Sequence, residues 1–102
     1  MSRAYRVGEK KDCGVVVSST DGSSFSITNA TFVYKIGATV ISQGTALIDA
    51  LKVYTPLAPT QVAAHSVVTF SITCQPLTSN GQPDTSKTTE IVMYDVVVKV
   101  TN

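Results

Sequence analysis

Cysteine and histidine are the side chains in this chain best suited to nucleophilic chemistry. Cys13 and Cys74 are its only cysteines, and His65 is its only histidine. A catalytic Cys–His pair needs the imidazole within hydrogen-bond reach of the thiol. Cys74 follows His65 on what we expect to be one extended strand, which would separate them by roughly 30 Å. We therefore interpret His65 as a surface or strand-entry residue, and both cysteines as buried and non-catalytic.

The remaining polar residues form no recognisable catalytic, metal or cofactor site. The seven acidic residues include no close pair and no metal-binding spacing, although acid–base and metal chemistry need converging carboxylates. No glycine-rich loop opens a helix to cradle phosphate. Two cysteines are too few for a four-cysteine zinc site. The sequence does not decide whether Cys13 and Cys74 form a disulfide. We expect no enzyme, no cofactor, no metal and no small-molecule substrate.

Alternating apolar residues predict an all-β fold. Apolar residues recur at every second position in four segments: 13–17, 30–36, 68–74 and 92–100. The second segment lies within an expected strand over 25–36, and turn residues separate the strands. Such alternation is typical of strands with one buried face. The turns include Asp21-Gly22, and residues 75–87 are polar enough to predict a long exposed loop. About six to seven strands at near-regular spacing indicate an antiparallel β-sandwich.

Residues 45–54 are ambiguous between strand and helix. Leu47, Leu51 and Tyr54 have the spacing of a helical stripe. The neighbouring segments are short strands, however, and Gly44 has no side-chain oxygen to cap a helix. We predict a strand here.

The first twelve residues differ from the rest in pattern. Residues 1–12 contain Arg3, Arg6, Lys10 and Lys11, half of the chain's eight Lys and Arg, without apolar periodicity. We interpret them as a flexible or loosely docked basic arm, followed by a single domain over residues 13–102. A solvated tail is the simpler interpretation, and contact with an acidic protein partner is the functional one. With a net charge of only +1, nucleic acid is an unexpected partner.

The same segment bears on localisation. It lacks the apolar stretch of a signal peptide, and no apolar run approaches the roughly 20 residues of a membrane-spanning helix. We expect synthesis in the cytoplasm and no membrane partner.

The middle of the chain resembles a known family of domains. Asp21-Gly22 leads to residues 27–32 (ITNATF), then to 40–44 (VISQG), 57–59 (LAP) and 66–70 (SVVTF). This order is similar to the small immunoglobulin-like sandwiches of tailed-phage virion proteins, such as the N-terminal domain of baseplate upper proteins. The resemblance covers about residues 21–74. It implies a phage or prophage virion component, and it transfers no functional residue. The chain has no Trp, and Ile72 stands where antibody domains have the tyrosine of the tyrosine corner.

The C-terminal strand has apolar residues on both faces. Its inward face is supplied by residues 92, 94, 96, 98 and 100, which leaves Ile91, Met93 and Val97 on the opposite face. In a two-layer sandwich these three side chains need a cover, which is either the N-terminal arm or a neighbouring subunit.

These observations predict a structural or adaptor protein that acts through contacts with other protein subunits, including copies of itself. The alternative is a recognition module that binds carbohydrate or peptide through its loops. The small number of aromatic residues, most of them predicted to lie in the core, disfavours this alternative.

Overall fold

The protein folds into two packed β-sheets. The computed structural model describes residues 2–19 and 22–102, and within them there are eight strands and no helix. Their bounds are β1 Ser2–Arg6, β2 Lys11–Val16, β3 Phe25–Ile36, β4 Thr39–Thr45, β5 Leu47–Asp49, β6 Lys52–Leu57, β7 Ala63–Pro76 and β8 Glu90–Thr101. The prediction of an all-β chain is confirmed. The expected six to seven strands are corrected to eight.

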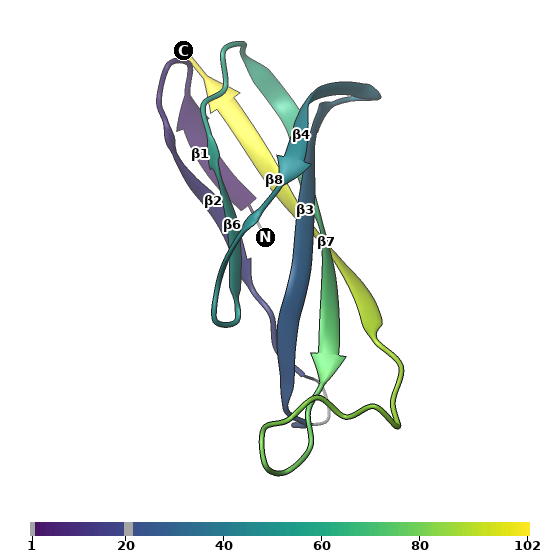
Figure 1. Ribbon diagram of the computed structural model, residues 1–102. Helices are drawn as coiled ribbons and strands as arrows, with labels where there is room; N and C mark the ends of the chain where they lie inside the picture. The colour runs from purple at the N-terminus through teal and green to yellow at the C-terminus, as the bar shows by residue number, and fades with distance from the viewer. Residues whose placement is uncertain (1, 20–21) are drawn as a thin grey trace.

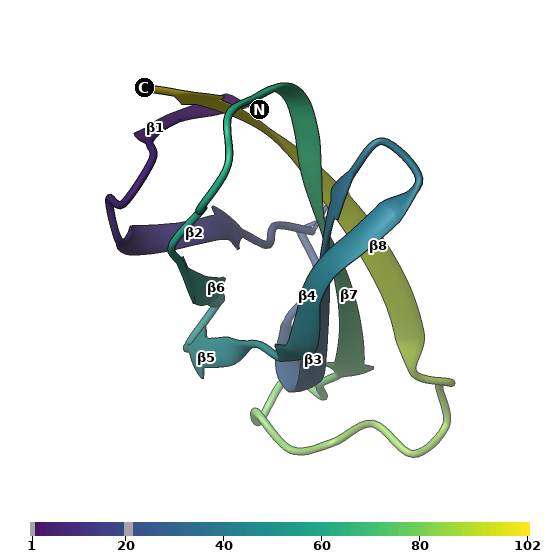
Figure 2. The same ribbon diagram turned by 90° about the horizontal axis from the view of Figure 1, so that it is seen from above.

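The strands divide unequally between the sheets. The larger sheet has the order β1-β8-β7-β3-β4, and the smaller has the order β2-β6-β5. All neighbours are antiparallel except β1 and β8, which are parallel. Figure 2 shows the smaller sheet facing the larger one. The result is a two-layer sandwich, as binary alternation requires when one face of each strand is apolar.

The core lies between the two sheets. On the larger sheet Val68, Phe70 and Ile72 of β7 are fully buried, as their alternation predicted. On the smaller sheet Cys13 of β2 and Val53 of β6 are likewise fully buried. Alternate residues of a strand point to opposite faces, so the two sets meet across the sandwich.

The N-terminal residues are part of the larger sheet. Ser2 to Arg6 pair with Val97 to Thr101 of β8, and the Tyr5 side chain is 2 % exposed. Lys11 and Asp12 begin β2, which pairs with β6. The interpretation of residues 1–12 as a flexible arm is therefore corrected: the backbone of β1 completes a ladder, and Tyr5 supplies core surface. Met1, Thr20 and Asp21 of the predicted arm and turn lie outside the described residues.

Residues 45–54 are strands separated by a turn. β4 ends at Thr45, β5 covers Leu47–Asp49, and β6 begins at Lys52. Ala50 adopts a positive φ of 54° in the turn. The preference for strand over helix is confirmed, and the single strand expected here is corrected to parts of three. The helical spacing of the apolar residues reflects this turn.

The two sheets differ in length. β3, β7 and β8 have 12, 14 and 12 residues, whereas β2, β5 and β6 have 6, 3 and 6. Figure 1 shows the long strands continuing past the smaller sheet toward the loop that joins β7 to β8. We call this end of the molecule, where β7 ends and β8 begins, the loop end. There the larger sheet is only partly covered by the smaller one.

Candidate interaction surface on strand β8

The outward face of β8 carries exposed apolar side chains. Ile91 and Met93 are both 67 % exposed and Val97 is 40 % exposed. Asp95 lies between Met93 and Val97, and its carboxylate accepts a hydrogen bond of 2.8 Å from the Thr69 hydroxyl. Because β1 lies beside β8 in the same sheet, it does not cover this face. Of the two covers considered for these side chains, the N-terminal segment is thereby excluded.

The outer edge of β8 is only half paired. β1 pairs with residues 97–101, and β7 pairs with β8 on the other side. Among the described residues, no strand pairs with Glu90–Val96 on the β1 side. In Figure 1, β1 runs alongside the upper part of β8 only. A row of backbone N–H and C=O groups is therefore open to a further strand.

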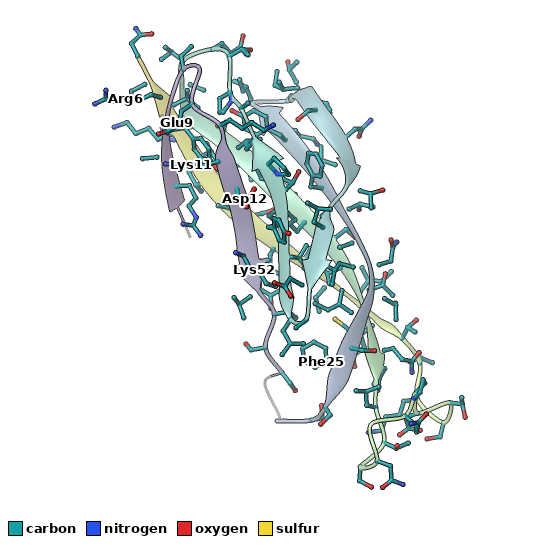
Figure 3. The ribbon with its side chains drawn as sticks, turned by 60° about the vertical axis from the view of Figure 1, so that its left-hand side comes forward. Arg6, Glu9, Lys11, Asp12, Phe25 and Lys52 are labelled. Atoms are coloured by element: carbon teal, nitrogen blue, oxygen red, sulfur yellow. The ribbon has the colours of Figure 1, made fainter. Side chains whose placement is uncertain are left out.

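A groove lies on the inward side of this open edge. Its volume is about 570 Å³, and its walls include Val17, Phe25, Cys74, Val92 and Tyr94. Val92 and Tyr94 are half-buried, unlike Val96 and the inward residues beyond it, which are fully buried. Figure 3 shows Phe25 at this end of the molecule, far from Arg6, Glu9 and Lys11. The groove exists because the smaller sheet ends before the loop end.

Two charged residues stand at the rim of the groove. Glu90, the first residue of β8, faces Cys74 across the ladder, and Lys87 precedes it in the loop. Glu90 is exposed. The apolar walls thus meet solvent beside a carboxylate.

The four basic residues singled out in the sequence lie at the other end of β8. Arg3 and Arg6 are on β1, Lys10 is in the turn that follows, and Lys11 opens β2; all four are exposed. The structure does not bring them next to Ile91 or Met93.

Lys11 has a structural role within this group. Its Nζ donates to the Ala4 carbonyl at 2.7 Å, lies 3.3 Å from the Glu9 carboxylate, and stands 4.6 Å from the Tyr5 ring centroid. Hydrogen bonds from the Arg6 backbone N–H and from Lys11 lower the pKa of Glu9. These contacts tie β1 to β2, so Lys11 is engaged within the chain, whereas the exposed side chains of Arg3, Arg6 and Lys10 remain candidates for contact with a partner.

Cys74 and His65 are too far apart to form a catalytic pair. Cys74 lies opposite Glu90, while Ser66, next to His65, lies opposite Val98. Eight ladder positions at about 3.3 Å each separate them by roughly 26 Å. Burial raises the pKa of the Cys13 thiol, and burial and then the Glu90 carboxylate raise that of Cys74. Both therefore stay protonated at neutral pH, and a protonated thiol is a poor nucleophile.

The two cysteines do not form a disulfide in the structure. Both are free and buried. Cys13 interacts with the Tyr5 hydroxyl, and Tyr5 lies opposite Val100. Cys74 lies opposite Glu90, ten positions away along β8. Both thiols are free, which answers the question of a disulfide that the sequence left open.

Comparison with known proteins gives no relative. No family model, no curated protein and no solved structure matches this chain. Within residues 2–19 and 22–102, no three His, Cys, Asp or Glu side chains come together to hold a metal ion. The described chain also contains no helix long and apolar enough to cross a membrane. The surface itself must therefore support any functional proposal.

Sequence reasoning missed two parts of this surface. Val92 and Tyr94 were placed in the core, and Glu90 was given no role. The sequence did not show which part of the β8 edge is open, because strand pairing is a property of the sheet. One signal was available in the sequence: the alternating segments 30–36, 68–74 and 92–100 are longer than 13–17.

Proposed function

We propose that this protein is a non-catalytic structural or adaptor module that binds other protein subunits through β8. The observation that carries the proposal is the exposure of Ile91 and Met93 beside an open strand edge. Exposed apolar side chains grouped on one face mark interaction sites, and an open edge adds backbone hydrogen bonds to the same contact. Arg3 and Lys10 at the other end of β8 supply further polar contacts.

The strand order supports an immunoglobulin-like type of sandwich. In such domains strands A′, G, F, C and C′ form one sheet and B, E and D the other. The orders β1-β8-β7-β3-β4 and β2-β6-β5 correspond to these two sets. Cys13 and Cys74 lie on the strands equivalent to B and F, but at opposite ends, so they do not reproduce the antibody disulfide. Together with the sequence resemblance, this strand order favours a module that is part of a phage or prophage virion.

A recognition module that takes an extended peptide or a sugar is the second candidate. The observation in its favour is the groove at the loop end, with Phe25 and Tyr94 in its walls. The two candidates differ in the solution size of the free protein. A recognition module works as a monomer, whereas a virion part assembles into discrete oligomers.

The double substitution Met93→Lys with Val97→Lys tests the proposal. It places charge on the outward face of β8, where both side chains are exposed, so folding is expected to be retained. We expect the variant to lose the assembly that wild-type protein shows by sedimentation velocity across a concentration series. Val40→Lys with Ile41→Lys is the matched control, because these residues of β4 are 45 % and 42 % exposed at the opposite edge of the same sheet. Unchanged assembly of the β8 variant would show that this face is not the interface.

A further inference from the structure

The open edge of β8 lacks most of the features with which proteins usually protect an edge strand, although it has two charged residues, Glu90 and Asp95. Edges are commonly blunted by short strands, bulges, charged side chains (especially lysine) or proline. β5 is only three residues long, and the pairing of β4 is interrupted by a register shift at Tyr34/Lys35. Residues 90–96 (EIVMYDV) contain neither lysine nor proline. The β7–β8 register is continuous beside them, from Cys74 opposite Glu90 to Val67 opposite Val97. This edge is built to accept another strand.

We propose that the occupant is β8 of a second copy of this chain, paired antiparallel through Glu90–Val96 about a twofold axis at Met93. The two five-stranded sheets would then form one continuous sheet. This inference rests on the proposed function, because it names the partner of the β8 surface.

The register follows from the alternation of faces. In β8 the even-numbered residues face inward and the odd-numbered residues face outward. Residues directly opposite each other in an antiparallel pair share a face, so the twofold axis must pass through a residue. Only an axis at Met93 pairs all seven open positions. Val92 then lies opposite Tyr94 of the second copy, and Ile91 lies opposite Asp95.

Charge complementarity favours a second copy over an unrelated strand. In this register Glu90 of the second copy lies opposite Val96 of the first. The next ladder position along β8, Val97, is paired with Ser2 of β1. Arg3 pairs with Val98 and so faces inward like Glu90. The two side chains are two positions apart, about 7 Å along the strand, and both are exposed. The twofold axis forms this ion pair twice.

Apolar contacts on both faces accompany the ladder. On the outer face Met93 meets Met93 of the second copy, with an Ile91 from each copy nearby. On the inner face Val92 and Tyr94 form cross-strand pairs that cover part of the groove. Pairing therefore removes from water the side chains that a single copy leaves exposed, which is the expected driving force for association.

Cysteine substitution tests the register directly. Met93→Cys places two thiols opposite each other with Cβ atoms about 5 Å apart. Ile91→Cys places them four positions apart, about 13 Å along the strand. The two positions are matched, because both are 67 % exposed on the same face. We expect mild oxidation to give a dimer band in non-reducing electrophoresis for Met93→Cys and at least tenfold less for Ile91→Cys. Wild-type protein controls for Cys13 and Cys74, which are buried. Equal cross-linking of both variants, or none in either, would overturn the proposal.

A charge reversal tests the ion pair. We expect Arg3→Glu to weaken dimerisation about tenfold in the dissociation constant, because two exposed pairs become repulsive. Adding Glu90→Arg should restore it to within about threefold of wild type. Sedimentation equilibrium measures the constants, and far-UV circular dichroism checks the fold. Failure of the double variant to recover would argue against Arg3 and Glu90 as neighbours.

The outcomes separate this inference from the proposed function. If the lysine variant of β8 loses assembly while Met93→Cys and Ile91→Cys cross-link equally, the β8 surface is the interface but the twofold pairing at Met93 is wrong. If the wild-type protein assembles and the lysine variant assembles equally well, both proposals are wrong.

Discussion

At the scale of single residues, Gly14 is the position where two strands come closest. It lies on β2 opposite Tyr54 of β6. A Cβ atom at Gly14 would stand 2.6 Å from the Tyr54 Cβ and 2.7 Å from the Val53 carbonyl oxygen. Neither neighbour is the end of a flexible side chain. Glycine is therefore required here by close approach rather than by backbone conformation.

We expect Gly14→Ala to destabilise the fold by about 1–3 kcal/mol, the usual cost of inserting an atom into a packed site. Gly44→Ala is the control, since its Cβ would meet only Phe32 Cε1 at 3.7 Å, and its effect should stay within about 0.5 kcal/mol. Urea unfolding measures both. Similar free energies of unfolding for the two variants would contradict the argument.

At the scale of secondary structure elements, hydrogen bonds and packing hold the N-terminal strand β1 in the sandwich. The Tyr5 hydroxyl donates to the Lys11 carbonyl at 3.2 Å, and the Val7 backbone N–H donates to the Thr101 carbonyl at 2.8 Å. The segment thus crosses from the larger to the smaller sheet under several constraints. Its basic residues are carried on an ordered strand, which fixes their position relative to the open edge of β8.

We expect Tyr5→Ala to cost about 3–5 kcal/mol, as for other large aromatic side chains removed from a core. Val7→Ala truncates a side chain that is 39 % exposed and should cost less than about 1 kcal/mol. Thermal and urea unfolding compare the two. A Tyr5→Ala protein as stable as wild type would show that β1 contributes little to the fold and is only loosely docked.

At the scale of the whole molecule, buried ionisable groups couple stability to alkaline pH. Burial raises the pKa of Tyr5, Cys13 and Cys74 in the folded state. In the unfolded chain a thiol titrates near pH 8.5 and a tyrosine near pH 10. The folded state therefore holds these protons more tightly. This contribution to stability is complete below about pH 8.5 and is lost as the pH rises through the raised pKa values.

We expect the free energy of unfolding to fall between about pH 8.5 and pH 10.5. The variant with Cys13→Ala and Cys74→Ala should be less stable at pH 7 but have a smaller pH dependence between pH 8.5 and 10. Urea titrations at fixed ionic strength measure both curves. A pH dependence in the double variant as steep as in wild type would assign the effect to other groups.

The local pattern of the sequence determined the strands and their inward faces. Alternation over residues 68–74 and 92–100 predicted which side chains are buried in β7 and which side of β8 faces the core. These features were predictable because the period of two is a property of the strand itself. The exposure of Ile91, Met93 and Val97 followed from the same pattern.

The tertiary structure alone decided which strands pair and where the smaller sheet ends. β1 pairs with β8 from the other end of the chain, although residues 1–12 show no apolar period. Such pairing depends on contacts between distant segments, and the local sequence carries little of that information. The limited extent of the smaller sheet leaves Val92 and Tyr94 half-exposed and half of the β8 edge open. The candidate surface is thus produced by the lengths and neighbours of whole strands, which only the assembled sheets define.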